Sequence, residues 1–224
     1  MNWQALMLTL RLSLVTASAL LLIALPIACW IAYSPRRWKF LAQAATALPL
    51  VMPPTVLGFY VLVAFGSSSP LGRLYQDWTG HTLAFTFEGL VVGSILYSMP
   101  FAVQPLVTSF LAIDPKLIQA SRVLGASRLA TFFRVVLPLS ISGLVTAIAL
   151  TFAHTFGEFG VVLMVGGDIP GLTRTISIDV FDKVEAGNYA AANTTSLVLL
   201  AVSFVILALV YAWNRRAWPR MPWA

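Results

Sequence analysis

Four polar side chains interrupt an apolar stretch over residues 139–165: Thr151, His154, Thr155 and Glu158. They recur at intervals of three and four residues, so one face of a helix would carry all four. A carboxylate inside a bilayer is costly and by default faces a partner or a hydrated cavity. His154 and Glu158 are four residues apart and could pair, either as a proton relay or as a structural brace. We favour a polar, partly hydrated pathway wall braced by this pair.

Patterns for catalysis and metal binding are missing from the sequence. Its two histidines, His81 and His154, lie far apart, and its single cysteine, Cys29, cannot form an intrachain disulfide. No Gly-x-x-x-x-Gly-Lys-Ser/Thr phosphate loop occurs, so ATP cannot bind this chain in that way. We therefore expect no catalytic residue, no metal site and no cofactor on this chain, and we do not expect it to be an enzyme.

Two further segments are candidates for a pathway or a gate. Residues 166–171 form a Gly-rich turn that contains Asp168, and Arg174 follows soon after. This turn could be an extracytoplasmic gate that meets a substrate-delivering protein, or a plain external hairpin. The apolar block 42–65 contains Pro53 and Pro54, which would free backbone carbonyls inside a bilayer. Either a broken helix beside a polar pathway or a simple packing kink would explain them.

The composition is that of a polytopic membrane protein. Hydrophobic residues make up 59% of the 224 residues, and charged residues only 10%, against about a quarter in soluble domains. The net charge of +6 does not indicate nucleic acid, because the basic residues sit at the ends of apolar blocks rather than in one stripe.

Five apolar blocks are long enough to cross a hydrocarbon core of roughly 30 Å. We predict one all-α transmembrane domain over residues 1–224, with a polar, loop-like segment up to Thr86 between the second and third spans. The predicted spans are residues 12–33, 42–65, 87–113, 139–165 and 193–213.

Basic residues predict the orientation of these spans. With the N-terminus outside and the C-terminus inside, ten of the fourteen Lys and Arg residues are cytoplasmic. The positive-inside rule therefore favours this arrangement. The cytoplasmic set is Arg36, Arg37, Lys39, Lys116, Arg122, Arg128, Arg134, Arg215, Arg216 and Arg220, whereas Arg11, Arg73, Arg174 and Lys183 are outside.

On the cytoplasmic side, residues 114–138 predict two short amphipathic helices. Asp114 can cap the first helix, and Pro115 suits its first position. Gly125 can end that helix in a left-handed conformation, and Ser127 can cap the second. Such a pair between two spans suits docking against a protein outside the bilayer.

The same segment resembles a motif of permease subunits of binding-protein-dependent ABC importers. Their pattern is Glu-Ala-Ala, three residues, Gly, nine residues, Ile, one residue, Leu-Pro. This chain keeps the spacing and departs from the residue types at Gln119, Ser121 and Val135. The resemblance implies a type I importer transmembrane domain whose loop 114–138 docks on an ATPase. The implied coupling residues are Gln119, Ala120, Ser121, Gly125, Ala126, Ser127, Val135, Leu137 and Pro138.

Nearly the whole chain resembles the molybdate branch of this family. The similar segments are Pro49–Gly58, Met99-Pro100-Phe101, Gly157–Gly160, Asp168–Gly171 and Thr173-Arg174-Thr175. The resemblance implies a permease homodimer in a bacterial inner membrane, two ATPase subunits that bind ATP-Mg, and an extracytoplasmic molybdate-binding protein. Sulfate and tungstate permeases share much of the pattern and remain alternatives.

Two other classes of protein fit less well. An ion-coupled secondary transporter would need intramembrane charges, often with inverted repeats, whereas one acidic residue lies deep in a span and no repeat is visible. A membrane metalloenzyme would need clustered ligands. We therefore expect an importer permease.

Overall fold

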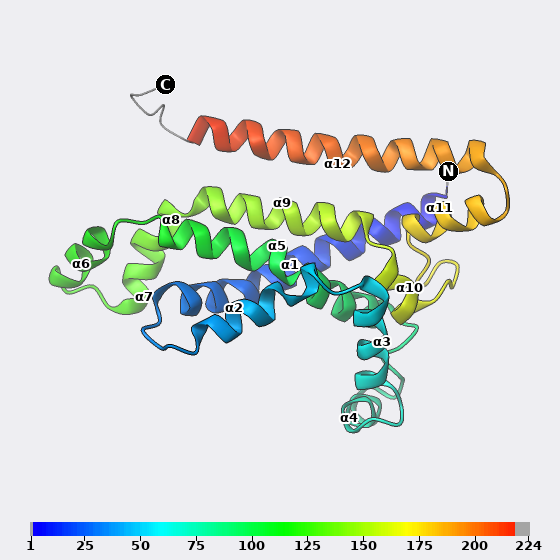
Figure 1. The fold of residues 1–224 in the computed structure, drawn as a ribbon, viewed down its shortest axis with the longest axis horizontal. Helices are drawn as coiled ribbons and strands as arrows, with labels where there is room; N and C mark the ends of the chain where they lie inside the picture. The colour runs from blue at the N-terminus through cyan, green and yellow to red at the C-terminus, as the bar shows by residue number, and fades with distance from the viewer. Residues whose placement is uncertain (1, 218–224) are drawn as a thin grey trace.

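The computed structural model describes residues 2–217, with side chains up to residue 213, and all the regular structure in this part is helical (Figure 1). This confirms the predicted all-α class. Three residues of the predicted cytoplasmic set, Arg215, Arg216 and Arg220, lie outside the described side chains.

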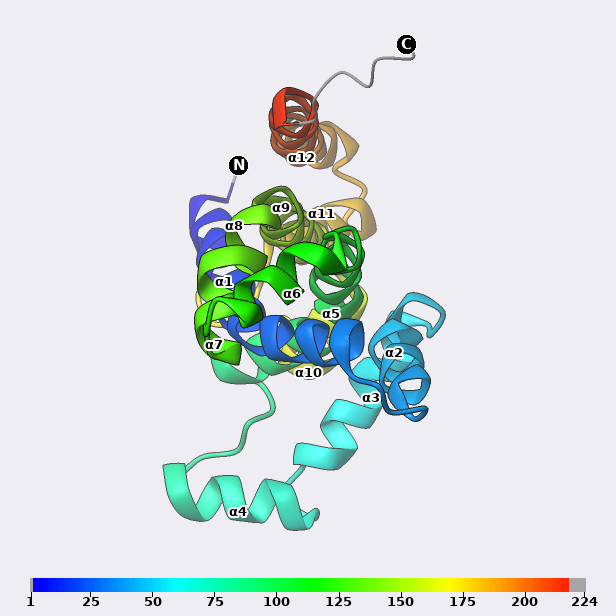
Figure 2. The same cartoon turned by 90° about the vertical axis from the view of Figure 1, so that its left-hand side faces the viewer.

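Three long helices form the body of the molecule: α1 (Trp3–Tyr33), α5 (Phe87–Leu111) and α9 (Ile141–Gly157). They lie side by side in the end-on view of Figure 2. Small buried side chains such as Ala24, Ala28 and Ala147 let the helix axes approach closely, and Leu106 and Phe110 fill the space between them. The helix α1 begins at Trp3, nine residues before the predicted span at Leu12.

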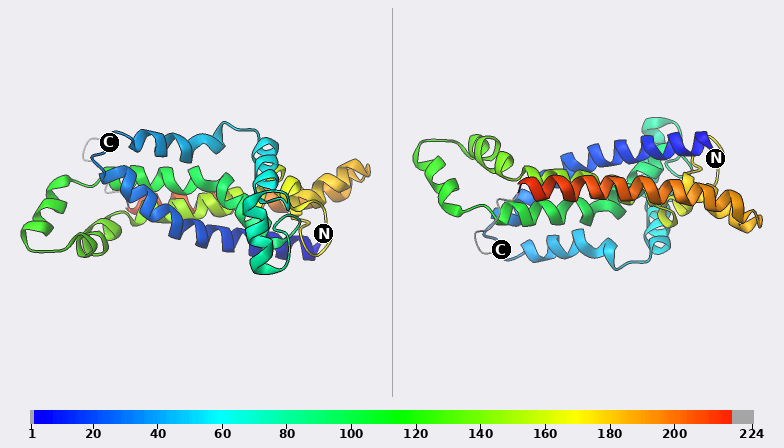
Figure 3. Two further views of the ribbon diagram at one scale, coloured as in Figure 1. Left: turned by 90° about the horizontal axis from the view of Figure 1, so that it is seen from below. Right: turned by 90° about the horizontal axis from the view of Figure 1, so that it is seen from above.

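The outer faces of the body are apolar. The helix α12 (Tyr189–Ala217) packs on α9 and α11 and exposes Leu200, Phe204 and Leu209 (Figures 2 and 3). On α1, Leu14 and Leu22 are similarly exposed. Large apolar side chains on the surface of long helices are typical of contact with lipid. Three described helices, α1, α5 and α12, are each long and apolar enough to cross a membrane. The number of spans rises to as many as five if each of two bent helix pairs counts as one span.

The first bent pair lies in the proline-rich block. The helix α2 (Lys39–Ala47) runs into a 3-10 turn, η1 (Leu48–Leu50), and α3 (Pro54–Phe65) then leaves at 112°. Pro54 opens α3, and Pro53 precedes it in an extended conformation. The helix is therefore broken at these prolines, and a polar pathway beside the break stays a prediction.

A separate break, after Gly157, corrects the expectation of one helix over residues 139–165. The α9 helix ends at Gly157, Glu158 has extended backbone angles, and α10 (Gly160–Gly166) runs separately. A Cβ atom on Gly160 would lie 2.6 Å from Pro54, so only a glycine lets α10 pack this closely on α3. The break places α10 against α3 and α5 instead of continuing α9.

The segment before Thr86 is also more ordered than expected. It contains the helix α4 (Pro70–Thr79), which Ser69 caps and which ends at Gly80 with φ of +80°. The prediction of a loop was wrong because the polar composition hid a regular start and stop. Ser69-Pro70 and Gly80 are typical helix boundary residues.

Two of the functional candidates, residues 114–138 and the turn 166–171 with Arg174, lie at opposite ends of the molecule. The short helices between α5 and α9 project from one end, whereas α4, α11 (Ile176–Glu185) and the loop before α11 lie toward the other (Figures 1 and 3). This arrangement fits the predicted separation of a docking segment from a gate. Which end faces the cytoplasm stays a prediction.

Candidate functional site

The predicted docking segment, residues 114–138, forms the two expected helices, α6 (Pro115–Val123) and α7 (Arg128–Thr131). The Asp114 carboxylate accepts a hydrogen bond from the Lys116 amide at 2.9 Å, and the Ser127 hydroxyl accepts one from the Ala130 amide at 3.2 Å. Between the helices, Gly125 has φ of +82°, a conformation that favours glycine. Each local signal in this part of the sequence therefore has the predicted structural role.

Contacts between the two helices and the body hold the segment in place. The Ser121 and Thr131 hydroxyls lie 3.1 Å apart, and Thr131 is buried. A single π-helical turn, η2 (Phe132–Val136), follows α7 and packs the Phe132 ring against Phe110 of α5. A short α8 (Leu137–Leu139) then leads to α9, at a bend of 73° between the residue 128–139 segment and α9. The segment therefore packs directly against α5 and continues into α9.

The surface of this segment is unusually apolar. Val123 and Leu124 are each 87% exposed, and Leu129 and Phe133 are largely exposed on the next turns. Exposed apolar patches of this kind are typical of surfaces that contact another protein, a membrane or a ligand. Sequence reasoning did not single out Val123 or Leu124 as a contact surface. An apolar pair directly before a helix-ending glycine was the available signal.

The predicted coupling residues divide between this surface and its support. The exposed group is Gln119, Ala120, Gly125, Ser127 and Pro138, and the half-buried group is Ser121, Ala126, Val135 and Leu137. The exposed residues can touch a partner directly, whereas the half-buried ones shape the backbone beneath them.

Two polar residues of α9, His154 and Thr155, face α5. Thr151 and Thr155 are almost fully buried between the helices. The Ser98 hydroxyl on α5 lies 3.0 Å from the Thr155 hydroxyl and 3.0 Å from Nδ1 of His154. Ser98 therefore joins the two residues into one chain of hydrogen bonds. Sequence reasoning missed Ser98, because a lone serine in an apolar helix gives no signal of what it faces.

The predicted pair of His154 and Glu158 does not form. Glu158 lies in the break after α9 rather than on the same helical face, and the residue is 4% exposed. Neither carboxylate oxygen has a partner at good hydrogen-bonding geometry among the described residues, although the Ser94 hydroxyl of α5 interacts with it electrostatically. His154 instead bonds to Ser98. The predicted brace between His154 and Glu158 is therefore wrong. The hydrogen bond of His154 goes to Ser98 of α5 instead.

Of the predicted proline pair, Pro54 lies close to this region. Its ring contacts Gly160, two residues beyond Glu158. The break in the first bent pair and the break after α9 therefore meet each other. Pro53, Pro54, Glu158 and the α9 threonines were predicted separately, and the fold brings Pro54 and the Glu158 break together.

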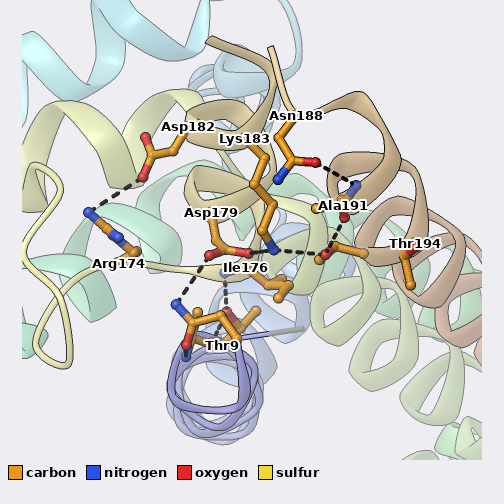
Figure 4. Close-up of polar contacts among 12 residues, drawn as sticks. Thr9, Arg174, Ile176, Asp179, Asp182, Lys183, Asn188, Ala191 and Thr194 are labelled. Atoms are coloured by element: carbon orange, nitrogen blue, oxygen red, sulfur yellow. Dashed lines mark hydrogen bonds and ion pairs between the residues drawn. The ribbon is translucent and has the colours of Figure 1, made fainter. Parts of the chain in front are cut away.

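The third candidate lies at the other end, where Arg174 joins the loop to α11. Its guanidinium pairs with the Asp168 carboxylate through both oxygens, and its terminal nitrogen lies 3.5 Å from Asp182 (Figure 4). The Asp168 hydrogen bond raises the pKa of Arg174, while burial and the Asp168 charge raise the pKa of the Asp182 carboxyl. This loop is therefore an ordered turn fixed to α11, and its role as a gate stays a prediction.

Asp179 is the centre of a second polar cluster beside Arg174 (Figure 4). Its carboxylate accepts from the Asn2 amide at 3.1 Å and from the Lys183 ammonium at 2.5 Å, and Lys183 also donates to Thr195 of α12 at 3.0 Å. Close by, the Ile176 amide donates to the Thr9 hydroxyl of α1 at 2.8 Å. The helix α11 is therefore tied to the starts of both α1 and α12.

Comparison with known proteins matches residues 24–221 to the model of the binding-protein-dependent transport system inner membrane component family. The chain belongs to this family. A relative from Azotobacter vinelandii, named molybdenum transport system permease protein ModB, is 48% identical over 94% of this chain and 93% of the relative. The Escherichia coli K12 protein of the same name is 34% identical over 96% and 94%. A Synechocystis sulfate transport system permease protein, CysT, is 30% identical over 80% of this chain and 63% of its own length.

Solved structures agree on the fold of this inner membrane component. The inward-facing MetNI methionine ABC transporter superposes with a TM-score of 0.73 at 18% identity, covering 97% of this chain and 96% of the matched chain. A bacterial ABC transporter for the acidic polysaccharide alginate gives 0.70 at 18% identity, over 95% and 78%. The predicted fold, a type I ABC importer transmembrane domain, is thereby confirmed. This chain is a membrane-embedded transport permease and not an enzyme.

Proposed function

We propose that this chain is the permease subunit of an ATP-driven molybdate importer. The observation that carries the proposal is the 48% identity, over nearly the full length of both proteins, to a molybdenum transport permease. A sulfate permease is also similar, but at 30% identity and over a smaller share of its own length. Molybdate is therefore the favoured oxyanion, with sulfate and tungstate as the alternatives.

The proposed assembly has two copies of this chain in a bacterial inner membrane. Two ATPase subunits, which bind ATP-Mg, dock on the exposed surface of residues 114–138, and an extracytoplasmic binding protein delivers molybdate at the opposite end. The apolar patch at Val123, Leu124 and Phe133 supports docking, because it would otherwise face water. Ion-coupled transport is not favoured, since the family depends on binding proteins.

Gene disruption and complementation test the substrate. Loss of this gene should lower the activity of molybdenum-cofactor enzymes when molybdate is scarce, and a plasmid copy or excess molybdate should restore it. A requirement for an organic sulfur source, with molybdoenzymes unaffected, would instead assign the chain to sulfate. Tungstate as the true cargo would show as lost tungstate accumulation with normal molybdate uptake.

A further inference from the structure

The helices α5 and α9 share a face that carries hydrogen-bond donors at membrane depth. On α1 and α12 the exposed side chains include many large apolar ones, such as Leu14, Leu22, Leu200 and Phe204. On α5 and α9 the half-buried side chains include His154, Tyr97 and Gln104, which can all donate hydrogen bonds. Polar groups at membrane depth face a partner or a hydrated cavity rather than lipid. This face is therefore directed toward a polar pathway.

His154 is fixed at the centre of this face. Its ring stacks on Phe101, with 4.1 Å between ring centroids, and lies 4.8 Å from the Tyr97 ring. Its Nδ1 atom is held by Ser98. The other ring nitrogen, Nε2, has no partner among the described residues and is not sealed inside the protein. The Tyr97 hydroxyl likewise has no hydrogen-bond partner among the described residues and is not sealed inside the protein.

The hydrogen-bond chain can set which nitrogen carries the proton. If the Thr155 hydroxyl donates to Ser98 and Ser98 donates to Nδ1, then Nε2 of a neutral His154 carries the proton and is a donor toward the open face. Thr155 and Ser98 are buried, so water does not compete for these bonds. Ser98 and Thr155 therefore fix the His154 ring with Nε2 toward the open face.

We propose that Nε2–H of His154, with the Tyr97 hydroxyl beside it, donates hydrogen bonds to the tetrahedral oxyanion as it passes through the membrane. This inference rests on the proposed function and assigns its substrate contact. The helices α3, α5, α9 and α10 contain no Lys or Arg, so neutral donors are the available partners for an anion there. Neutral donors hold an anion loosely enough to release it, as a transport pathway requires.

The test uses the whole complex in proteoliposomes: this chain, its ATPase and its binding protein, with labelled molybdate as the probe. His154→Phe keeps a ring between Tyr97 and Phe101 but removes the donor, and it should lower the initial uptake rate by about tenfold or more. His154→Gln keeps an N–H group and should stay within about threefold of wild type. His81→Phe makes the same exchange at the other histidine, on the surface between α4 and α5, and should not change uptake.

A second readout separates contact with the anion from a structural role. ATP hydrolysis stimulated by the loaded binding protein should remain at half the wild-type rate or more in His154→Phe. The inference is overturned if this variant transports normally, or if uptake and ATP hydrolysis fall together. If the wild-type complex itself takes up no molybdate, the proposed function fails instead, independently of any variant.

Discussion

At the scale of single residues, the main lesson is where buried polar groups find partners. Spacing along α9 suggested that His154 and Glu158 pair with each other, but the helix ends between them at Gly157. His154 then bonds to Ser98 on a neighbouring helix. Glu158 is left without a well-aligned partner in the described part of the chain. A pattern of three and four residues predicts a shared face only while the helix continues.

Glu158→Gln tests how Glu158 is accommodated. A buried carboxylate without a good partner destabilises the folded protein whenever it is ionised, and the amide cannot be charged. We expect the variant to keep most of the transport activity and to unfold in detergent at the same temperature as wild type or a few degrees higher. Glu158→Ala should lower transport, because it leaves a void beside Ser94. A fall of several degrees in Glu158→Gln would show that the charge makes a stabilising contact.

At the scale of elements, sequence reasoning succeeded where the signal was local. The caps at Asp114 and Ser127 and the left-handed Gly125 were all predictable, because each depends on the chemistry of a few neighbouring residues. The break after Gly157 was not, because it depends on Gly160 meeting Pro54 from a distant segment. The contact of Ser98 with His154 was missed for the same reason.

Gly125→Trp tests the docking segment. No atom lies within 4 Å of a Cβ placed there, so the Cβ itself has space, but the φ of +82° strains any non-glycine residue. We expect the variant to insert and dimerise normally and to lose ATPase binding. Copurification of a tagged chain with the ATPase measures this. Wild-type binding together with full transport would contradict the assignment of this segment.

Asp179→Ala tests the cluster that ties α11 to α1 and α12. The substitution removes the acceptor of Asn2 and Lys183 and leaves Lys183 with Thr195 as its remaining partner. Loss of a partly buried charged acceptor should destabilise the protein by about 1–3 kcal/mol. Protease sensitivity between α11 and α12 should rise. A matched control is Glu185→Ala, an exposed acidic residue at the end of the same helix, which should leave sensitivity unchanged.

At the scale of the whole molecule, the docking segment and the Arg174 loop lie at opposite ends (Figure 1). This separation is what an importer needs, since ATP acts on one side and cargo arrives on the other. The positive-inside rule predicts that the docking end is cytoplasmic. A reporter fused after Ala224 should therefore be active in the cytoplasm, and one fused near Ser68 on the external side. Activity of both reporters on one side would contradict the predicted orientation.

The central claim is that this chain moves molybdate inward when a partner hydrolyses ATP. Uptake of labelled molybdate into proteoliposomes that hold this chain and its ATPase, with the binding protein outside and ATP inside, tests it most directly. We predict accumulation that requires ATP and binding protein, that excess unlabelled sulfate does not abolish, and that Gly125→Trp eliminates. No ATP-dependent molybdate accumulation by a well-folded wild-type complex, or accumulation of sulfate in its place, would contradict the claim.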